Sequence, residues 1–364
     1  MKSISVLIKP ASSICNLRCS YCFYADVSSM REVRSFGKMK KENMEKMIAN
    51  IYADLEEGDT IKFAFQGGEP TMIGLAYFEN FVTYVKKQEK KVTVEYIIQT
   101  NGTLINDRWC KFLKENDFLV GLSIDSNEKF HDRNRVDYKQ RGTYRRVMQT
   151  KKNFDTYEIP YNVLCVLTEQ IAKKPYESFR FLLDQKIDYV QFIPCMDDFD
   201  TIKRGLYGVQ PQTFAKFYKK IFRLWKTEYE AGHYISIKLF DDISNLFNYN
   251  FVGACGLTGK CQIQYVIEAD GSVYPCDFYV TDEFKMGNIF ERTLREIFNE
   301  SSIPKRFICL RKELPKKCAQ CPFLAACGGG CKRMENHMYV DADNDFCGYQ
   351  EVLKDTVPYF TKKG

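Results

Sequence analysis

Short strand-like segments alternate with helical segments through the first two thirds of the sequence. The strand-like segments are mostly apolar and rich in β-branched and aromatic residues, which is typical of strands buried on both faces of a parallel sheet. They lie at 5–10, 60–66, 92–100, 118–125, 161–168, 188–194 and 234–240. The helical patterns lie at 41–57, 76–90, 107–115, 143–157, 175–185 and 211–229. This order predicts an α/β fold whose parallel sheet, open or closed into a barrel, carries its functional loops at the carboxyl ends of the strands.

The alternation stops after residue 240, and the remainder of the chain is rich in cysteine. Nine of the fifteen cysteines lie between residues 255 and 347. The segment 264–279 predicts a β-hairpin with Asp270-Gly271 at its turn. Because so small a cysteine-rich region builds little apolar core, metal has to organise it. We expect two domains, one over 1–240 and one over 241–364 that contains the hairpin, short helices and a C-terminal helix.

Charge and hydropathy argue against several classes of protein. The net charge of +6, from 53 basic and 47 acidic residues, is too weak to predict a nucleic-acid partner. The sequence has no run of roughly 18 apolar residues that predicts a membrane span, and its first ten residues are too short an apolar start for a signal peptide. We therefore expect a cytoplasmic protein, in which clustered cysteines bind metal more often than they form disulfides.

Three cysteines, Cys15, Cys19 and Cys22, lie within eight residues directly after the first predicted strand. A tetrahedral zinc ion takes four ligands, and no fourth candidate is nearby. Three thiolates on a [4Fe–4S] cluster leave one iron open for another molecule. This pattern resembles the radical S-adenosylmethionine (radical SAM) enzymes, in which the open iron binds the amino and carboxylate groups of SAM. The alternatives are a zinc knuckle and a chance cluster of cysteines.

The resemblance to radical SAM enzymes implies a partial (β/α)6 barrel and several residues that bind SAM. Tyr21, between two of the cysteines, is expected to cover the cluster. The stretch "FQGGEP" follows the next predicted strand, and its Gly67, Gly68 and Glu69 are expected to bind the SAM amino group. Glycines allow a close approach of the backbone, and a carboxylate suits an ammonium group.

Three further residues complete the SAM site that the resemblance implies. Ser123 lies near the end of the predicted strand "FLVGLSID", and with Arg135 it matches the pair that binds the SAM carboxylate. Met196 follows the strand 188–194 and matches the position that packs on adenine. A surface arginine and a methionine packed in the core are the alternatives.

The cysteines after residue 254 resemble the SPASM domain, the C-terminal extension of radical SAM enzymes that modify peptides. That domain holds two auxiliary [4Fe–4S] clusters, each with four cysteines. The expected ligands of the first are Cys255, Cys261, Cys276 and Cys331, and those of the second are Cys318, Cys321, Cys327 and Cys347. Half of a zinc ribbon is the alternative for the Cys-x2-Cys pair alone.

Four stretches closely resemble the anaerobic sulfatase-maturating enzymes, which are radical SAM dehydrogenases that convert a sulfatase Cys or Ser to formylglycine. The stretches are 63–71, 118–125, 255–261 and 268–289. The resemblance implies SAM, three [4Fe–4S] clusters, a sulfatase polypeptide substrate and a flavodoxin- or ferredoxin-type reductant. It makes Asp277 the base that takes the thiol or hydroxyl proton, with Tyr24 and Gln66 lining the substrate pocket.

One departure from the family and one rival function remain open at this point. The family commonly has Gly-Pro after "SxD", where this chain has Ser126-Asn127. The rival is a radical SAM/SPASM maturase that forms thioether or carbon–carbon crosslinks in a ribosomal peptide. A plain iron–sulfur electron carrier explains neither the GGEP stretch nor the open three-cysteine site.

Overall fold

A computed structural model describes residues 2–199, 207–310, 313–341, 343 and 345–361. The chain divides into two compact units. The first unit contains the described residues up to Ser123 together with Arg135–Tyr161 and Ile263–Cys309. The second unit contains Ile124–Asn134 and the described residues of 162–262 and 310–364. Both units draw on segments from each side of residue 240, so the domain boundary expected there stays a prediction.

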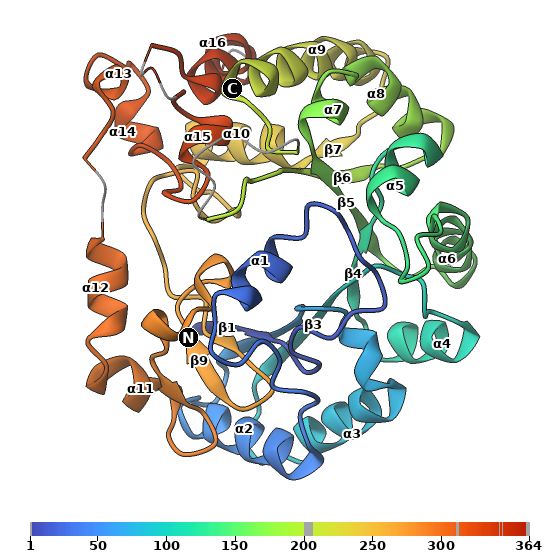
Figure 1. The fold of residues 1–364 in the computed structure, drawn as a ribbon, viewed down its shortest axis with the longest axis vertical. Helices are drawn as coiled ribbons and strands as arrows, with labels where there is room; N and C mark the ends of the chain where they lie inside the picture. The colour runs from blue at the N-terminus through green and yellow to red at the C-terminus, as the bar shows by residue number, and fades with distance from the viewer. Residues whose placement is uncertain (1, 200–206, 311–312, 342, 344, 362–364) are drawn as a thin grey trace. The chain divides into compact units, whose positions relative to one another are not determined.

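The first unit is built on a sheet with the strand order β10-β9-β8-β1-β2-β3-β4 (Figure 1). Strands β1 to β4 are parallel, β8 is parallel to β1, and β8, β9 and β10 run antiparallel to one another in turn. Their bounds are Ser3–Ile8 (β1), Thr60–Phe65 (β2), Thr93–Thr100 (β3), Leu119–Ser123 (β4), Val266–Ile267 (β8), Ser272–Tyr274 (β9) and Gly287–Asn288 (β10). The predicted strands at 5–10, 60–66, 92–100 and 118–125 and the predicted hairpin are therefore confirmed.

The helices of the first unit supply much of its core. They are α1 (Phe23–Ser29), α2 (Lys41–Ala53), α3 (Leu75–Lys86), α4 (Asp107–Glu115), α6 (Tyr144–Tyr157), α11 (Leu294–Glu300) and α12 (Ile303–Cys309). Helix α2 packs beside α3, and α4 packs beside α6 (Figure 1). Phe65 of β2 meets Phe78 and Phe81 of α3 edge-on at 4.9 and 5.0 Å between ring centroids. Each such buried ring contributes about 1.5–3 kcal/mol through its removal from water.

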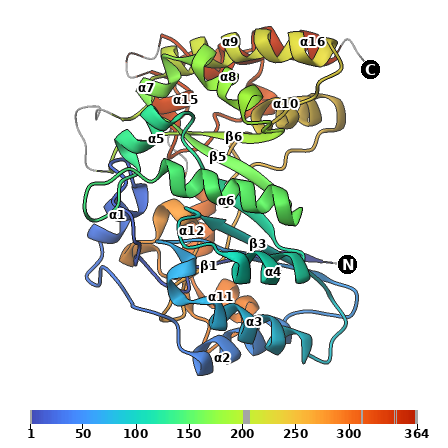
Figure 2. The same cartoon turned by 90° about the vertical axis from the view of Figure 1, so that its right-hand side faces the viewer.

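The second unit contains three parallel strands and the remaining helices. The strands β5 (Tyr161–Leu167), β6 (Tyr189–Pro194) and β7 (Ser236–Ile237) pair in that order. The helices are α5 (Glu128–Asn134), α7 (Glu169–Ala172), α8 (Pro175–Asp184), α9 (Pro211–Glu230), α10 (Lys238–Tyr249), α13 (Lys316–Ala319), α14 (Leu324–Cys327), α15 (Glu335–Met338) and α16 (Gly348–Phe360). Helix α16, the expected C-terminal helix, lies against α9 (Figure 2).

The predicted strand at 234–240 is wrong over most of its length. Only Ser236–Ile237 forms a strand, and α10 begins at the next residue. Leu239, Phe240 and Ile243 are all buried, and their spacing suits one face of a helix better than one face of a strand. The apolar run at 234–240 therefore combines the end of a short strand with the start of an amphipathic helix. No helix among the described residues is long and apolar enough to cross a membrane.

Candidate active site

Cys15, Cys19 and Cys22 lie on the loop between β1 and α1, at the carboxyl end of β1. The Cys15 Sγ accepts hydrogen bonds from the backbone N–H of Leu17 at 3.3 Å and from Asn101 Nδ2 at 3.9 Å. Burial raises the pKa of the Cys15 thiol to about 11, and the nearby Cys22 adds to this shift. Bound iron would reverse the shift, since a thiol that coordinates a metal is deprotonated.

Gly67 and Gly68 let the loop after β2 pack directly against this cysteine loop. The Gly68 backbone N–H donates to the Ser12 carbonyl at 2.8 Å. A Cβ atom on Gly68 would lie 2.2 Å from the Ile14 carbonyl oxygen, which is far inside contact distance. Gly67 has a φ of +126°, a backbone conformation that favours glycine. These two predicted SAM-site residues therefore lie next to the three cysteines.

Glu69 is fully buried and ties the same loop to the end of β3. Its Oε1 accepts hydrogen bonds from the Thr71 backbone N–H and the hydroxyls of Thr71 and Thr100, at 2.7–3.1 Å. Its Oε2 accepts one from the Asn101 backbone N–H at 2.7 Å. Burial raises the pKa of the Glu69 carboxyl, while these donors lower it. Glu69 thus holds two strand-end loops beside the cysteines, and its SAM contact stays a prediction.

Arg135 and Tyr21 also meet at the cysteine loop. The Arg135 guanidinium lies 5.6 Å from the centroid of the Tyr21 ring, within the range of a cation–π contact. Ser123, its expected companion, is the buried last residue of β4 in the same unit. Met196 is buried in the second unit, directly beyond β6. The roles of these four residues in binding SAM stay predictions.

Asp277 is buried in a group of polar side chains that come from distant parts of the sequence. Its Oδ1 lies 2.5 Å from the Lys9 Nζ, and its Oδ2 accepts a hydrogen bond from Gln66 Nε2 at 2.7 Å. The Tyr24 ring lies beneath the Lys9 ammonium, which is 3.7 Å from the ring centroid. The structure thus brings together Asp277, Gln66 and Tyr24, which the sequence had assigned to the same site.

The register of the sheet explains why these residues converge. Ile8, at the end of β1, pairs with Phe65 on one side and Ile267 on the other. The residues that follow these three positions are Lys9, Gln66 and Glu268, and the carboxyl ends of parallel strands meet at one edge.

A second buried ion pair adjoins Tyr24. Arg31 Nη1 lies 2.8 Å from Glu268 Oε1, and both side chains are fully buried. The Tyr24 hydroxyl donates a hydrogen bond to the same Glu268 oxygen. Burial and the Glu268 carboxylate raise the pKa of Tyr24 well above its usual value, which keeps the phenol protonated. Tyr24 therefore links the Glu268 pair to the Lys9 pair.

Cys318, Cys321, Cys327 and Cys347 line one cavity in the second unit. Gln350 Nε2 donates to the Cys321 Sγ at 3.3 Å. Burial raises the pKa of Cys327 to about 12 and that of Cys347 to about 11. Cys318 and Cys347 are buried and the other two cysteines are half-buried, and four thiols that line one cavity are a donor set that suits an iron–sulfur cluster.

The other predicted auxiliary set is divided between the units. Cys255, Cys261 and Cys331 belong to the second unit, where burial and the neighbouring cysteines raise the pKa of Cys255 and of Cys331. Cys276 belongs to the first unit, so this set stays a prediction. Within the described ranges, no three His, Cys, Asp or Glu side chains surround a single metal ion.

Comparison with known proteins shows the family of this chain. The Radical SAM superfamily model matches residues 10–182, and the SPASM model, an iron-sulfur cluster-binding domain, matches residues 258–322. A cysteine-type anaerobic sulfatase-maturating enzyme of Clostridium novyi is 41% identical over 95% of this chain and 93% of its own length. This chain belongs to the anaerobic sulfatase-maturating enzymes.

A serine-type relative and a solved structure are also similar to this sulfatase-maturating enzyme over nearly its full length. A serine-type enzyme of Bacteroides thetaiotaomicron is 30% identical, over 100% of this chain and 92% of that protein. The solved structure of native anSMEcpe with bound AdoMet and Cp18Cys peptide superposes with a TM-score of 0.89 at 34% identity, covering 99% of this chain and 98% of that chain. The expected radical SAM fold with a SPASM domain is therefore confirmed, as are SAM and [4Fe–4S] clusters as the cofactors.

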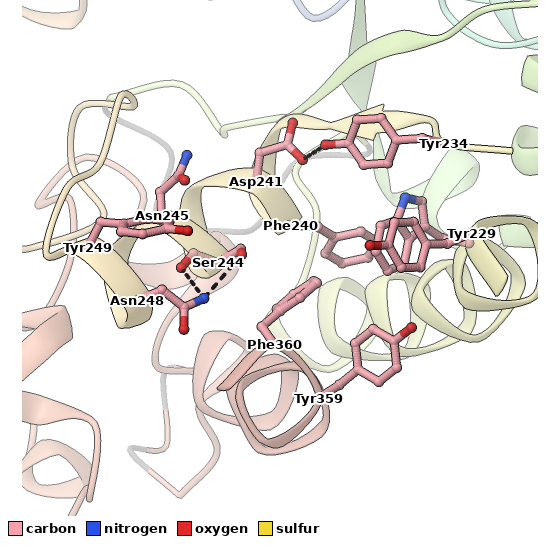
Figure 3. A pocket seen from close by; sticks show the side chains of 11 residues that line it. Tyr229, Tyr234, Phe240, Asp241, Ser244, Asn245, Asn248, Tyr249, Tyr359 and Phe360 are labelled. Carbon is pink, nitrogen blue, oxygen red and sulfur yellow. Dashed lines mark hydrogen bonds between the residues drawn. The ribbon is translucent and has the colours of Figure 1, made fainter. Parts of the chain in front are cut away.

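A separate pocket of about 540 Å³ lies among α9, α10 and the end of α16 (Figure 3). Aromatic side chains form much of its wall, and none of the predicted site residues lines it. Its one carboxylate, Asp241, accepts hydrogen bonds from Tyr234 at 2.6 Å and from Ser236 at 2.5 Å. The carboxylate is thus bound within the protein, and the pocket offers no group for the family's chemistry.

Lys9, Arg31 and Glu268 are the residues at this active site that the sequence did not reveal. For two of them the sequence offers a hint, because Lys9 directly follows the apolar strand β1 and Glu268 directly follows β8. Arg31 has no such position. Such charges usually face solvent, so the sequence alone favours a surface position for Lys9 and Glu268.

Proposed function

We propose that this sulfatase-maturating enzyme oxidises a cysteine of its sulfatase substrate to formylglycine, with Asp277 as the base. The observation that carries the proposal is the buried Asp277 carboxylate, held by Lys9 and Gln66 directly beside Cys276. The preference for cysteine is supported by identity, which is 41% to a cysteine-type relative and 30% to a serine-type relative.

Two groups of cysteines in the structure suit the cofactors. Cys15, Cys19 and Cys22 would hold the cluster that binds SAM, and the four-cysteine cavity would hold an auxiliary cluster. When bound, these groups supply the 5′-deoxyadenosyl radical that removes a hydrogen atom from the substrate Cβ, and an acceptor for the second electron. Glu69, Ser123 and Arg135 would bind the charged groups of SAM at the same strand ends.

Asp277 would move the one proton that the oxidation releases. Formation of the thioaldehyde removes a hydrogen atom from Cβ, a proton from the thiol and one electron, and water then replaces sulfur by oxygen. A carboxylate within hydrogen-bond reach of the thiol can take that proton. Gln66 and Tyr24 would line the space where the substrate cysteine enters.

The expected surroundings of the reaction complete the proposal. The substrate is a sulfatase polypeptide or peptide, and a flavodoxin- or ferredoxin-type protein supplies electrons. We keep the cytoplasm as the predicted location, with no membrane or nucleic-acid partner. The reductant, the location and the absence of these partners are predictions from the sequence.

The proposal is tested with anaerobically reconstituted enzyme and peptides that carry Cys or Ser in a C/S-x-P/A-x-R context. We expect the Cys peptide to lose two hydrogens and then exchange sulfur for oxygen, with slower turnover of the matched Ser peptide. Mass spectrometry that finds an intramolecular crosslink instead would favour the rival maturase function. Asp277→Asn should still form 5′-deoxyadenosine but at least about 100-fold less formylglycine, the usual contribution of a positioned base.

A further inference from the structure

Both oxygens of the Asp277 carboxylate are held by side chains from other strands. Lys9 contacts Oδ1 at 2.5 Å, and Gln66 contacts Oδ2 at 2.7 Å. The Asp277 backbone N–H donates to Gln264 Oε1 at 3.2 Å, which fixes the position of the main chain as well. The carboxylate therefore has one charged partner, in an ion pair at Oδ1 that lacks hydrogen-bond geometry, and one neutral partner, which donates a hydrogen bond to Oδ2.

The Lys9 side chain is 0% exposed, which is rare for a lysine. Its backbone is fixed by the sheet, where the Lys9 N–H donates to the Ile267 carbonyl at 2.8 Å. Gly67 makes room for its stem, since a Cβ there would lie 2.9 Å from Lys9 Cγ. The Tyr24 ring, 3.7 Å from the ammonium, stabilises the cation on its other side. The surrounding sheet, loop and ring thus leave the ammonium little freedom except to face Asp277.

Two buried ion pairs of the first unit both contact Tyr24. Lys9 and Arg31 are the cations, and Asp277 and Glu268 are the anions, with Tyr24 as the shared neutral contact. A buried ion pair stabilises a fold weakly, because desolvation offsets most of the attraction. Fold stability alone therefore does not explain a lysine here, and a role in orienting the carboxylate does.

We propose that Lys9 is a positioning residue of the oxidation, an inference that rests on the proposed role of Asp277 as base. Lys9 holds Oδ1 so that Asp277 keeps the orientation in which it takes the substrate proton. Without Lys9, a single neutral amide holds the carboxylate, which is then able to rotate about its side-chain bonds. SAM cleavage then continues while fewer of the cleavage events lead to product.

The test measures iron content, 5′-deoxyadenosine and formylglycine in variants of the reconstituted enzyme with the cysteine peptide. Lys9→Met should keep its iron and still form 5′-deoxyadenosine, while formylglycine per 5′-deoxyadenosine falls about tenfold or more. Lys9→Arg should restore part of that ratio because it keeps the cation. The control is Lys62→Met on the neighbouring strand β2, which removes a half-exposed lysine paired with Glu95 at 2.8 Å and should leave the ratio unchanged.

Several outcomes would overturn the proposal. A wild-type ratio in Lys9→Met contradicts it, and so does an additive further loss when Lys9→Met is combined with Asp277→Asn, because Lys9 is proposed to act through Asp277. If Lys9→Met loses iron, Lys9→Gln gives the decisive ratio, which is again expected to fall. Failure of the proposed function looks different, because wild-type enzyme then makes no formylglycine or Asp277→Asn makes as much as wild type.

Discussion

Ser126 illustrates, at the scale of one residue, how this chain departs from its family. It has a φ of +56°, a left-handed conformation that side chains disfavour, where the family commonly has glycine. Its hydroxyl is buried and has no hydrogen-bond partner among the described residues. The neighbours hold this geometry, since Asp125 Oδ1 accepts from the Val166 N–H at 3.0 Å and Asn127 Oδ1 accepts from the Phe130 N–H at 3.2 Å. Ser126 thus keeps a left-handed backbone conformation of the kind that glycine adopts readily.

We predict that Ser126→Gly stabilises the enzyme by about 1 kcal/mol, since it relieves the left-handed strain and removes a buried unpaired hydroxyl. The change should appear as a rise in Tm during anaerobic thermal unfolding. Ser244→Gly in α10 is the control, and it should lower the Tm because glycine weakens a helix. An unchanged or lower Tm for Ser126→Gly would show that the strain is compensated elsewhere.

Single residues also show the limit of sequence reasoning at the active site. Asp277, Gln66 and Tyr24 were predictable because they lie in recognisable stretches or beside a cysteine that is expected to bind a cluster. Lys9 and Arg31 were missed, since a charge in one segment is interpretable only once its partner is known. Lys9 and Asp277 are distant in the sequence, and the parallel pairing of β1 with β8 is what brings their segments together.

At the scale of elements, the cysteine loop depends on the loop after β2 as much as on its own residues. The absence of a side chain at Gly68 allows the two backbones to touch, and Glu69 then joins them to the end of β3. Strand positions were predictable from apolar runs, except at 234–240, where a strand and a helix share one run. The loop contacts were not predictable, because they depend on shape complementarity between segments that have no regular period.

We predict that Gly68→Ala displaces the cysteine loop, because its Cβ would lie 2.2 Å from the Ile14 carbonyl oxygen. The variant should lose about a third of its iron, corresponding to one of three clusters, and should not cleave SAM. Gly74→Ala is the control, since a Cβ at Gly74 meets no atom within 4 Å although its φ is +102°. Full iron content and SAM cleavage in Gly68→Ala would contradict the proposed packing.

At the scale of the whole molecule, the predicted cluster ligands are divided between the two units. The three-cysteine loop and Asp277 belong to the first unit, and the four-cysteine cavity belongs to the second. The fold class was predictable because the βα alternation and the cysteine series are both long patterns. The division into units was not, since each unit combines segments from both ends of the chain.

We predict about twelve irons and twelve sulfides per chain after anaerobic reconstitution, which corresponds to three clusters of four. Replacing Cys318, Cys321, Cys327 and Cys347 together by alanine should lower both numbers by about four and leave SAM cleavage in place. Iron and sulfide analysis with a 5′-deoxyadenosine assay measures both effects. Iron near one cluster's worth in the wild-type enzyme would contradict the auxiliary assignment.

The ion pair between Lys9 and Asp277 also bears on the order in which the chain can fold. Strand β1 lies between β2 and β8, so it becomes an interior strand only after the later segment has been synthesised. A chain cut near residue 240 would lack β8, which pairs with β1, and would lack Asp277, the counterion of Lys9. Strand β1 would then keep an unpaired edge, which is prone to pair with other chains. The N-terminal βα segment is therefore unsuited to independent expression, and a shortened enzyme would have to retain the β8–β9 hairpin and Asp277.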